Sequence, residues 1–236
     1  SSTFAEGDFR LALAREFKLL ASLRHPNIIE VLDYGFDQEQ QPYFTMELLE
    51  NAQTIIQAAR NQPLNTRLTY IVQMLQALAY LHRREILHRD LKPANVIVVN
   101  GQVKVLDFGL SVMRDHTTSQ EDDGNTAGTL GYMAPEILIG NPASEAADLY
   151  AVGLIIYELF AGFHPFHPED GRALVQNIFE LIPDTAHMDA APQVQSITRL
   201  LLAKQPNNRP QNADVVITDL SAAVNRIIPM ETVAIR

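Results

Sequence analysis

The sequence contains no cysteine, and its basic residues are few. The lack of cysteine excludes a disulfide framework, a cysteine nucleophile and any zinc site built on thiolates. A cytoplasmic location is the simplest expectation for such a chain. Lys and Arg number 18 against 28 Asp and Glu, which gives a formal charge of −10. This balance argues against nucleic acid or an anionic membrane as the main partner.

Long hydrophobic runs are also absent, since no apolar stretch has the length needed to cross a membrane. The N-terminus lacks the basic start and apolar core of a signal peptide. The most apolar run covers residues 149–163 and contains one charged residue, Glu158. A helix that is apolar nearly all round belongs inside a core. We therefore expect residues 149–163 to form the central helix of one mostly helical domain.

Hydrophobic periodicity at the helical spacing predicts further helices. They cover residues 8–24, 65–83, 172–181, 194–203 and 213–227. Asn65 or Thr66 is the expected N-cap of the second of these. Two antiparallel strands are expected at residues 28–34 and 42–48, separated by a polar loop.

A hairpin is predicted where two β-branched runs, residues 96–99 and 102–106, flank Asn100-Gly101. Pairing outward from this turn matches Val99 with Gln102, Val98 with Val103, Val96 with Val105 and Asn95 with Leu106. Asn95 and Asp107 then emerge together at the open end. An amide and a carboxylate side by side are oxygen ligands suited to a magnesium ion that also holds substrate phosphates. Asp90 and Lys92 lie just upstream, so we expect all four side chains to converge.

Five motifs carry a family resemblance: HRDLKPAN (88–95), DFG (107–109), GTLGYMAPE (128–136), DLYAVG (148–153) and NNRP (207–210). In this order and spacing they resemble the catalytic domain of eukaryotic-type serine/threonine protein kinases. The resemblance covers essentially the whole chain, from the helix that carries Glu16 onward. It implies an α+β protein kinase-like fold of two lobes. Residues 1–49 would be a truncated small lobe with a helix, two strands and a hinge, and residues 50–236 would be the helical large lobe.

The resemblance implies roles for the site residues. Asp90 would accept the proton of the substrate hydroxyl, and Lys92 would place a positive charge on the γ-phosphate of ATP. Asn95, the third catalytic residue, and Asp107 would hold Mg²⁺. Glu16 would pair with a lysine on a small-lobe strand, Met46 is similar to the gatekeeper, and the backbone of residues 47–49 would bind adenine. The residues expected at ATP are therefore Glu16, Met46, Glu47, Leu49, Lys92, Asn95 and Asp107.

Other positions resemble structural residues of the family. Glu136 and Arg209 are similar to a buried ion pair, and Asp148 to the residue that supports the catalytic loop. A stacked apolar column between the lobes is implied, although ordinary core packing fits equally well; its residues are Leu20, Val31, His88 and Phe108. His82 is expected to be a packed or capped histidine. His164 and His167 near Asp170 have a spacing that a zinc ion would allow, but two ligands are missing and a turn is favoured.

The sequence departs from the family pattern at its start. No GxGxxG loop and no lysine precede Glu16, because the four lysines are Lys18, Lys92, Lys104 and Lys204. Strand alternation points Lys104 away from the face of its neighbours and predicts a solvated side chain. We expect a truncation, in which the chain is part of a larger polypeptide and is nearly inactive alone.

The predicted function is transfer of the ATP γ-phosphate to Ser or Thr hydroxyls of protein substrates in signalling, without nucleic acid or membrane insertion. The alternative is a pseudokinase or scaffold module that binds partners without catalysis. Arg89 would receive an activation-loop phosphate on Thr117, Thr118, Ser119 or Thr126. One of the acids Glu121, Asp122 and Asp123 is a second candidate partner for Arg89, and a solvated acidic loop fits the sequence at least as well.

Overall fold

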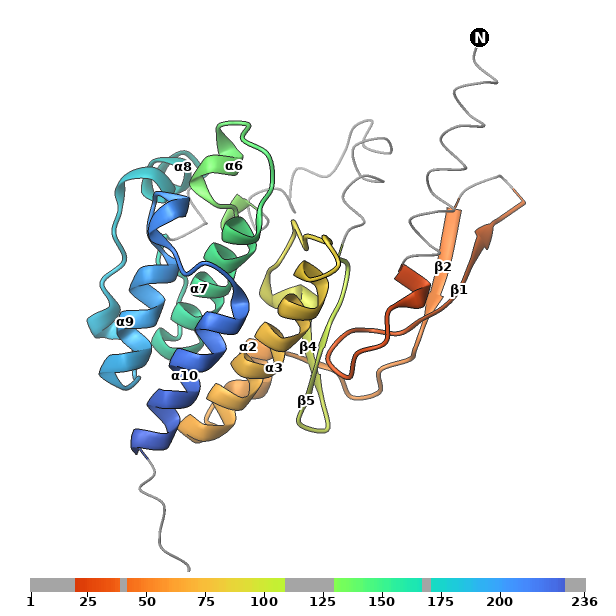
Figure 1. The fold of residues 1–236 in the computed structure, drawn as a ribbon, viewed down its shortest axis with the longest axis horizontal. Helices are drawn as coiled ribbons and strands as arrows, with labels where there is room; N and C mark the ends of the chain where they lie inside the picture. The colour runs from red at the N-terminus through yellow and green to blue at the C-terminus, as the bar shows by residue number, and fades with distance from the viewer. Residues whose placement is uncertain (1–19, 39–41, 109–129, 167–170, 228–236) are drawn as a thin grey trace, which may run out of the picture.

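The computed structural model describes residues 20–38, 42–108, 130–166 and 171–227. Figure 1 shows helices α6 to α10 on one side, α2, α3 and the β4–β5 hairpin in the middle, and β1 with β2 on the other side. The strands are β1 Val31–Phe36, β2 Pro42–Met46, β3 Gln53–Thr54, β4 Val96–Val99 and β5 Gln102–Val105. The helices are α2 Ile55–Ala59, α3 Leu64–His82, α6 Pro135–Leu138, α7 Glu145–Ala161, α8 Gly171–Glu180, α9 Pro192–Leu201 and α10 Ala213–Ile227. The α+β composition agrees with the expected class.

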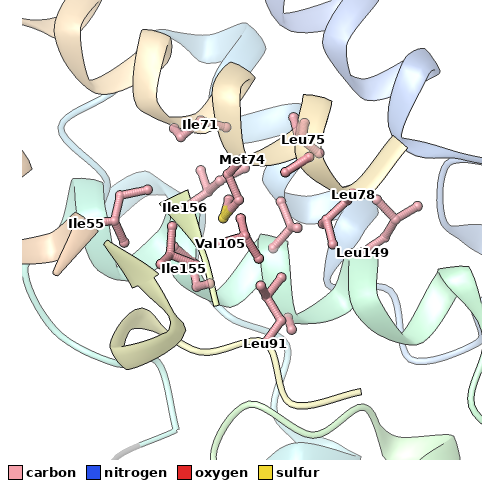
Figure 2. Packing of buried hydrophobic residues seen from close by; sticks show 14 of the residues in the cluster. Ile55, Ile71, Met74, Leu75, Leu78, Leu91, Val105, Leu149, Ile155 and Ile156 are labelled. Carbon is pink, nitrogen blue, oxygen red and sulfur yellow. The ribbon is translucent and has the colours of Figure 1, made fainter. Parts of the chain in front are cut away.

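The apolar run forms α7, the expected central helix, which begins upstream of the prediction with Ser144 as its N-cap. It ends at Gly162, whose φ of 82° is the left-handed conformation that favours glycine at this position. At Gly153 a Cβ would lie 2.8 Å from the Cβ of Leu201, so this glycine lets α7 and α9 approach closely. Figure 2 shows side chains of α2, α3, β5 and α7 meeting in the core, with Met74 and Ile156 among them.

The predicted helix at residues 65–83 is confirmed as α3, but the predicted cap is wrong. Pro63 is the N-cap residue and makes no side-chain cap hydrogen bond. The hydrogen bond from Arg67 N to Pro63 O (3.2 Å) already begins upstream of Asn65 and Thr66, so both lie inside the first turn. Proline is tolerated at this end because the first N–H groups of a helix have no intrahelical partner, so the N–H that proline lacks costs no hydrogen bond.

Sequence reasoning missed the short helix α2, although a signal was present. Thr54 Oγ1 accepts from Gln57 N (3.3 Å), and Gln57 Oε1 accepts from Thr54 N (3.0 Å), which is a capping box. The helix buries Ile55, Ala58 and Ala59. Its contacts with α7 and β4 fix the chain between the hinge and the large helical body.

The register predicted for the β4–β5 hairpin is confirmed. Val96 pairs with Val105, Val98 with Val103 and Val99 with Gln102. Asn100 and Gly101 have φ values of 51° and 79°, and positive values at both positions are typical of a type I′ turn. The hydrogen bond from Leu106 N to Asn95 O (2.9 Å) extends the pairing to the open end, as expected.

The first predicted strand begins later than expected, because residues 27–29 pair with β5 instead. Ile29 N donates to Val105 O (3.0 Å), and Val105 N donates to Asn27 O (2.9 Å). Strand β1 then starts at Val31 and pairs antiparallel with β2. Residues 27–29 thus connect the β1–β2 pair to the β4–β5 hairpin.

Three further predicted helices correspond to α8, α9 and α10, each starting within two residues of the prediction. Only the end of the predicted helix at residues 8–24 falls in the described part, and Glu16 lies outside it. The division into lobes at residue 49 stays a prediction. Within the described ranges, no helix is both long and apolar enough to cross a bilayer.

Candidate active site

Asp148 on α7 holds the segment that contains Asp90. Its carboxylate accepts from His88 N (2.9 Å) and from Arg89 N (3.0 Å), as expected from the motif. Arg89 has a φ of 67°, a conformation that is costly for a side chain of this size, so these bonds hold a strained turn in place. His82 Nε2 also lies 2.8 Å from Asp148, and His82 Nδ1 lies 3.5 Å from Glu145. The expected packed histidine therefore supports the same carboxylate.

The three predicted catalytic residues come together. Lys92 Nζ lies 3.1 Å from Asp90 Oδ2. Asn95 Nδ2 donates to Asp90 O at 2.8 Å and lies 3.3 Å from Asp90 Oδ2. An ammonium and an amide thus both contact the same carboxylate oxygen of Asp90. Such an arrangement suits a base that must accept a proton while positive charge lies close by.

Asn95 and Asp107 both lie at the open end of the hairpin, where the sequence predicts a metal. The Asn95 amide nitrogen donates to Asp90 O, so of the two amide atoms only Oδ1 could serve as a metal ligand. Asp107 is the residue after Leu106, whose N–H donates to Asn95 O. It is half-buried and has a φ of 55°. In the described part of the chain, no three His, Cys, Asp or Glu side chains gather as a metal cluster. Two oxygen ligands fit a hard divalent ion that takes its other ligands from phosphates and water.

The predicted hinge follows β2. Glu47 N donates to Glu30 O (3.0 Å), and Glu47 Oε1 accepts from Glu30 N (3.1 Å). Met46 is 36% exposed, Leu48 is fully on the surface, and Leu49 is half-buried. Among the described residues, Glu47 O and Leu49 N take part in no hydrogen bond, so both are available to a ligand.

The prediction that Lys104 is solvated is wrong. Its Nζ lies 2.7 Å from Glu47 Oε1, and its side chain is only 17% exposed. Alternation does point it away from the buried Val103 and Val105, but the hinge covers that face of the strand. Burial by itself raises the pKa of the Glu47 carboxyl; the hydrogen bonds from Lys104 and from Glu30 N–H outweigh burial and lower that pKa.

The four residues of the expected interlobe column are all buried: Leu20, Val31, His88 and Phe108. Burial agrees both with a column and with ordinary core packing. His88 is completely buried, and neither ring nitrogen has a hydrogen-bond partner among the described residues. Burial lowers the pKa of this imidazole, against the attraction of Asp148 and Asp90. His88 is therefore a neutral core residue.

The expected ion pair of Glu136 and Arg209 is confirmed. Arg209 Nη1 and Nη2 lie 2.6 Å and 2.8 Å from the two carboxylate oxygens of Glu136, and both residues are buried. Arg209 also donates to Ala146 O and Ala203 O, each at 2.8 Å. Its guanidinium lies 4.8 Å from the ring centre of Tyr150. This pair fastens α6 to the base of α7 and to the segment before α10.

A cavity of about 380 Å³ opens beside Asp90. Its walls come from the catalytic segment, from residues 132–134 and from the starts of α6 and α7. Arg89 and Asp90 face it together with apolar side chains such as Met133 and Ile137. Its position offers room for part of a substrate next to the carboxylate of Asp90.

Some predictions fall on residues outside the described part. These are the roles of Glu16, the activation-loop phosphosites, the acids at 121–123, and His167 with Asp170. A zinc site at His164 is not formed by the described residues, since both ring nitrogens contact backbone groups. Sequence reasoning also missed the contact between Tyr132 and Glu158, for which the lone carboxylate in an apolar run was the available signal.

Residues 5–220 match the family model described as protein kinase domain. The chain therefore belongs to the protein kinase family and has its α+β fold. It is 34% identical, over 92% of its length, to a probable serine/threonine-protein kinase of Streptomyces coelicolor, of which it covers 34%. It is 35% identical over 86% of its length to the DNA damage-responsive serine/threonine-protein kinase RqkA of Deinococcus radiodurans, covering 32% of it. It is 32% identical over 90% to the serine/threonine-protein kinase PknB of Mycolicibacterium smegmatis, covering 36% of it.

The chain thus spans about a third of the length of these relatives. Membership in the family implies ATP as a substrate and a divalent metal ion.

Proposed function

We propose that this chain is the catalytic part of a kinase that transfers the γ-phosphate of ATP to Ser or Thr hydroxyls of proteins. The observation that carries the proposal is the convergence of Lys92 and Asn95 on Asp90, in a turn held by Asp148. Relatives named serine/threonine-protein kinases support the choice of acceptor. The protein substrates are those of the whole polypeptide, of which we propose this chain to be one part, acting in cytoplasmic signalling.

The site residues have the following proposed tasks. Asp90 accepts the proton as the substrate hydroxyl oxygen bonds to the γ-phosphorus, and the bond from that phosphorus to the β–γ bridging oxygen breaks to leave ADP. Lys92 offsets the negative charge that develops on the transferred group. Asn95 Oδ1 and the Asp107 carboxylate would hold Mg²⁺, which supplies charge neutralisation of the phosphates when bound.

The nucleotide base is proposed to bind at the hinge. Glu47 O and Leu49 N supply an acceptor and a donor, and Met46 lies at the entrance to the hinge. Glu16 is proposed to pair with a lysine on a strand of the small lobe, as in the family pattern. Together these contacts place the triphosphate toward the open end of the β4–β5 hairpin.

The test is transfer of radiolabelled phosphate from ATP with Mg²⁺ by the natural polypeptide that contains residues 1–236. Asp90→Asn should reduce transfer by about 10²–10⁴-fold, with unchanged thermal unfolding and ATP binding. Asp219→Asn is the matched control, because Asp219 is exposed on α10 and away from the site. A folded wild-type protein that binds ATP but transfers no phosphate would overturn the proposal in favour of a scaffold.

A further inference from the structure

Residues 130–134 form part of the wall of the cavity beside Asp90. Three of their side chains line it: Tyr132, Met133 and Ala134. Arg89 and Asp90 line the same cavity. The position of this segment therefore sets the shape of the space next to the proposed catalytic base.

The segment is fastened to α7 and to the turn that follows it. Internally, Met133 N donates to Leu130 O (3.1 Å). Outward, the Tyr132 hydroxyl donates to Glu158 Oε2 on α7. The second outward tie joins His164 Nε2 to Gly131 O at a distance of 3.1 Å, in a buried position.

The direction of the second tie follows from the other ring nitrogen. Phe166 N donates to His164 Nδ1 (3.2 Å), so Nδ1 carries no proton. Nε2 must then carry the proton of the neutral ring and donate it to Gly131 O. The ring of His164 is also edge-on to the rings of Tyr132 and Phe166, with centroid distances of 5.0 Å and 5.7 Å. Aromatic contacts and both nitrogens thus fix the orientation of the imidazole.

The turn that bears His164 is itself anchored. Phe166 is fully buried, and its carbonyl accepts from Asn177 Nδ2 on α8 (3.2 Å). Lys204 Nζ lies 4.6 Å from the centre of the Phe166 ring and donates to Ile178 O (2.6 Å). The anchored turn therefore presents His164 to Gly131 in residues 130–134, the segment that lines the cavity.

We propose that His164 is a positioning residue for protein-substrate binding. By donating from Nε2 to Gly131 O, it holds residues 130–134 at the distance from Asp90 that the substrate requires. Its two ring nitrogens contact Gly131 O and Phe166 N, so we expect its effect to concern the protein substrate and not ATP. The inference rests on the proposed function, since it assigns the cavity to that substrate.

Two variants separate the two nitrogens of His164. His164→Gln can place an amide N–H near the position of Nε2 and restore the donor to Gly131 O. His164→Asn keeps an oxygen near the position of Nδ1, which still accepts from Phe166 N, but it has no donor that reaches Gly131. We expect His164→Asn to raise the KM for a Ser/Thr peptide by about two- to tenfold, the effect of one lost hydrogen bond. His164→Gln should recover most of this, with kcat and the KM for ATP unchanged in both.

The measurement uses the natural polypeptide, a peptide selected from an arrayed Ser/Thr library with the wild type, and thermal unfolding as a check on the fold. Equal peptide KM values for the Asn variant and the wild type, or equal losses in the Asn and Gln variants, would overturn the proposal. A parallel rise in the KM for ATP would do the same.

Hydrogen exchange gives a readout that does not depend on catalysis. Residues 130–134 should exchange faster in His164→Asn than in the wild type, and His164→Gln should resemble the wild type. Equal exchange in all three would overturn the positioning role even in an active kinase. If the wild type transfers no phosphate, the proposed function fails and takes the substrate role of His164 with it, while exchange still tests the tie itself.

Discussion

Lys104 on β5 and Glu47 at the start of the hinge form an ion pair, with 2.7 Å between Nζ and Oε1. The same Glu47 oxygen accepts from Glu30 N, and Glu47 N donates to Glu30 O. Glu47 is therefore held both by Lys104 on β5 and by Glu30, the residue before β1. Because the hinge backbone is the proposed adenine site, this pair connects the hairpin that carries Asn95 to the groups that would bind the base.

The first prediction concerns this pair. Lys104→Met removes the ammonium and leaves the partly buried Glu47 carboxylate with one fewer donor, so we expect the free energy of unfolding to fall by about 1 kcal/mol. The affinity for a non-hydrolysable ATP analogue should fall by about two- to fivefold, since each kcal/mol corresponds to roughly a fivefold change. Urea denaturation and a binding titration measure the two effects.

A double-mutant cycle supplies the control for Lys104. Glu47→Gln alone and the double variant with Lys104→Met should show a coupling energy of about 0.5 kcal/mol or more, because the two side chains are in direct contact. Fully additive effects would mean that the ion pair contributes nothing and that Lys104 acts through its apolar stem.

The second prediction concerns the buried pair of Glu136 and Arg209. Arg209→Lys cannot form both hydrogen bonds to the carboxylate, and it also loses donors to Ala146 O and Ala203 O. We expect a loss of about 3 kcal/mol in the free energy of unfolding, because a buried charge is left poorly paired. Chemical denaturation followed by circular dichroism measures it.

Arg83 provides a matched control on the surface. Its pair with Asp214 spans 3.0 Å, but both side chains are more than half exposed. Arg83→Lys should therefore change the free energy of unfolding by less than about 0.5 kcal/mol. Similar losses in the two Arg→Lys variants would contradict the importance of burial.

The third prediction is a pH dependence that comes from His88. Burial lowers the pKa of this imidazole in the folded protein, so below the ordinary value of 6.5 the unfolded chain binds a proton that the folded chain does not. Above pH 6.5 His88 does not lower the free energy of unfolding. As the pH falls below 6.5, protonation of the unfolded chain lowers it. The slope should approach about 1.4 kcal/mol per pH unit for one proton.

His88→Phe isolates that contribution. Neither ring nitrogen of His88 has a hydrogen-bond partner among the described residues, so an apolar ring should be tolerated. The pKa of His25 is also lowered, by burial and by nearby Arg83, Arg84 and Lys104, but His25 titrates in both proteins and cancels in the difference. As the pH is lowered from 7.5 to 5.5, the free energy of unfolding of the wild type should fall relative to that of the variant. A constant gap over this range would show that His88 does not titrate.

The part of the site that sequence could predict is the part set by local rules. Asn100-Gly101 fixes the hairpin register, and that register alone brings Asn95 and Asp107 to one end. The pairing of residues 27–29 with β5 and the contact of Lys104 with Glu47 join segments far apart in the chain. No periodicity encodes such contacts, because they depend on how separate elements pack.

The same distinction explains the helices. The apolar pattern of α7 identified a central helix, but its true N-cap, Ser144, lies before the run. The short α2 was overlooked because its three buried residues are too few to form a periodic pattern, although its capping box was readable. The support of the catalytic turn by Asp148 was expected only through the family motif, since the contact spans 59 and 60 positions.

The last prediction separates the two tasks of Asn95. Its amide nitrogen contacts Asp90, and its oxygen is the proposed metal ligand. Asn95→Asp keeps an oxygen for the metal but removes the donor and sets a second negative charge beside Asp90. We expect kcat to fall by about 10²-fold or more, because the base loses its orientation.

Asp107→Asn keeps Asp90 untouched and weakens the metal site alone, so it should mainly raise the Mg²⁺ concentration needed for half-maximal transfer. Mg²⁺ titrations of phosphate transfer, with removal by a chelator as the zero point, measure both. If excess Mg²⁺ restores Asn95→Asp as fully as it restores Asp107→Asn, then Asn95 serves only the metal, and its contact with Asp90 has no part in catalysis.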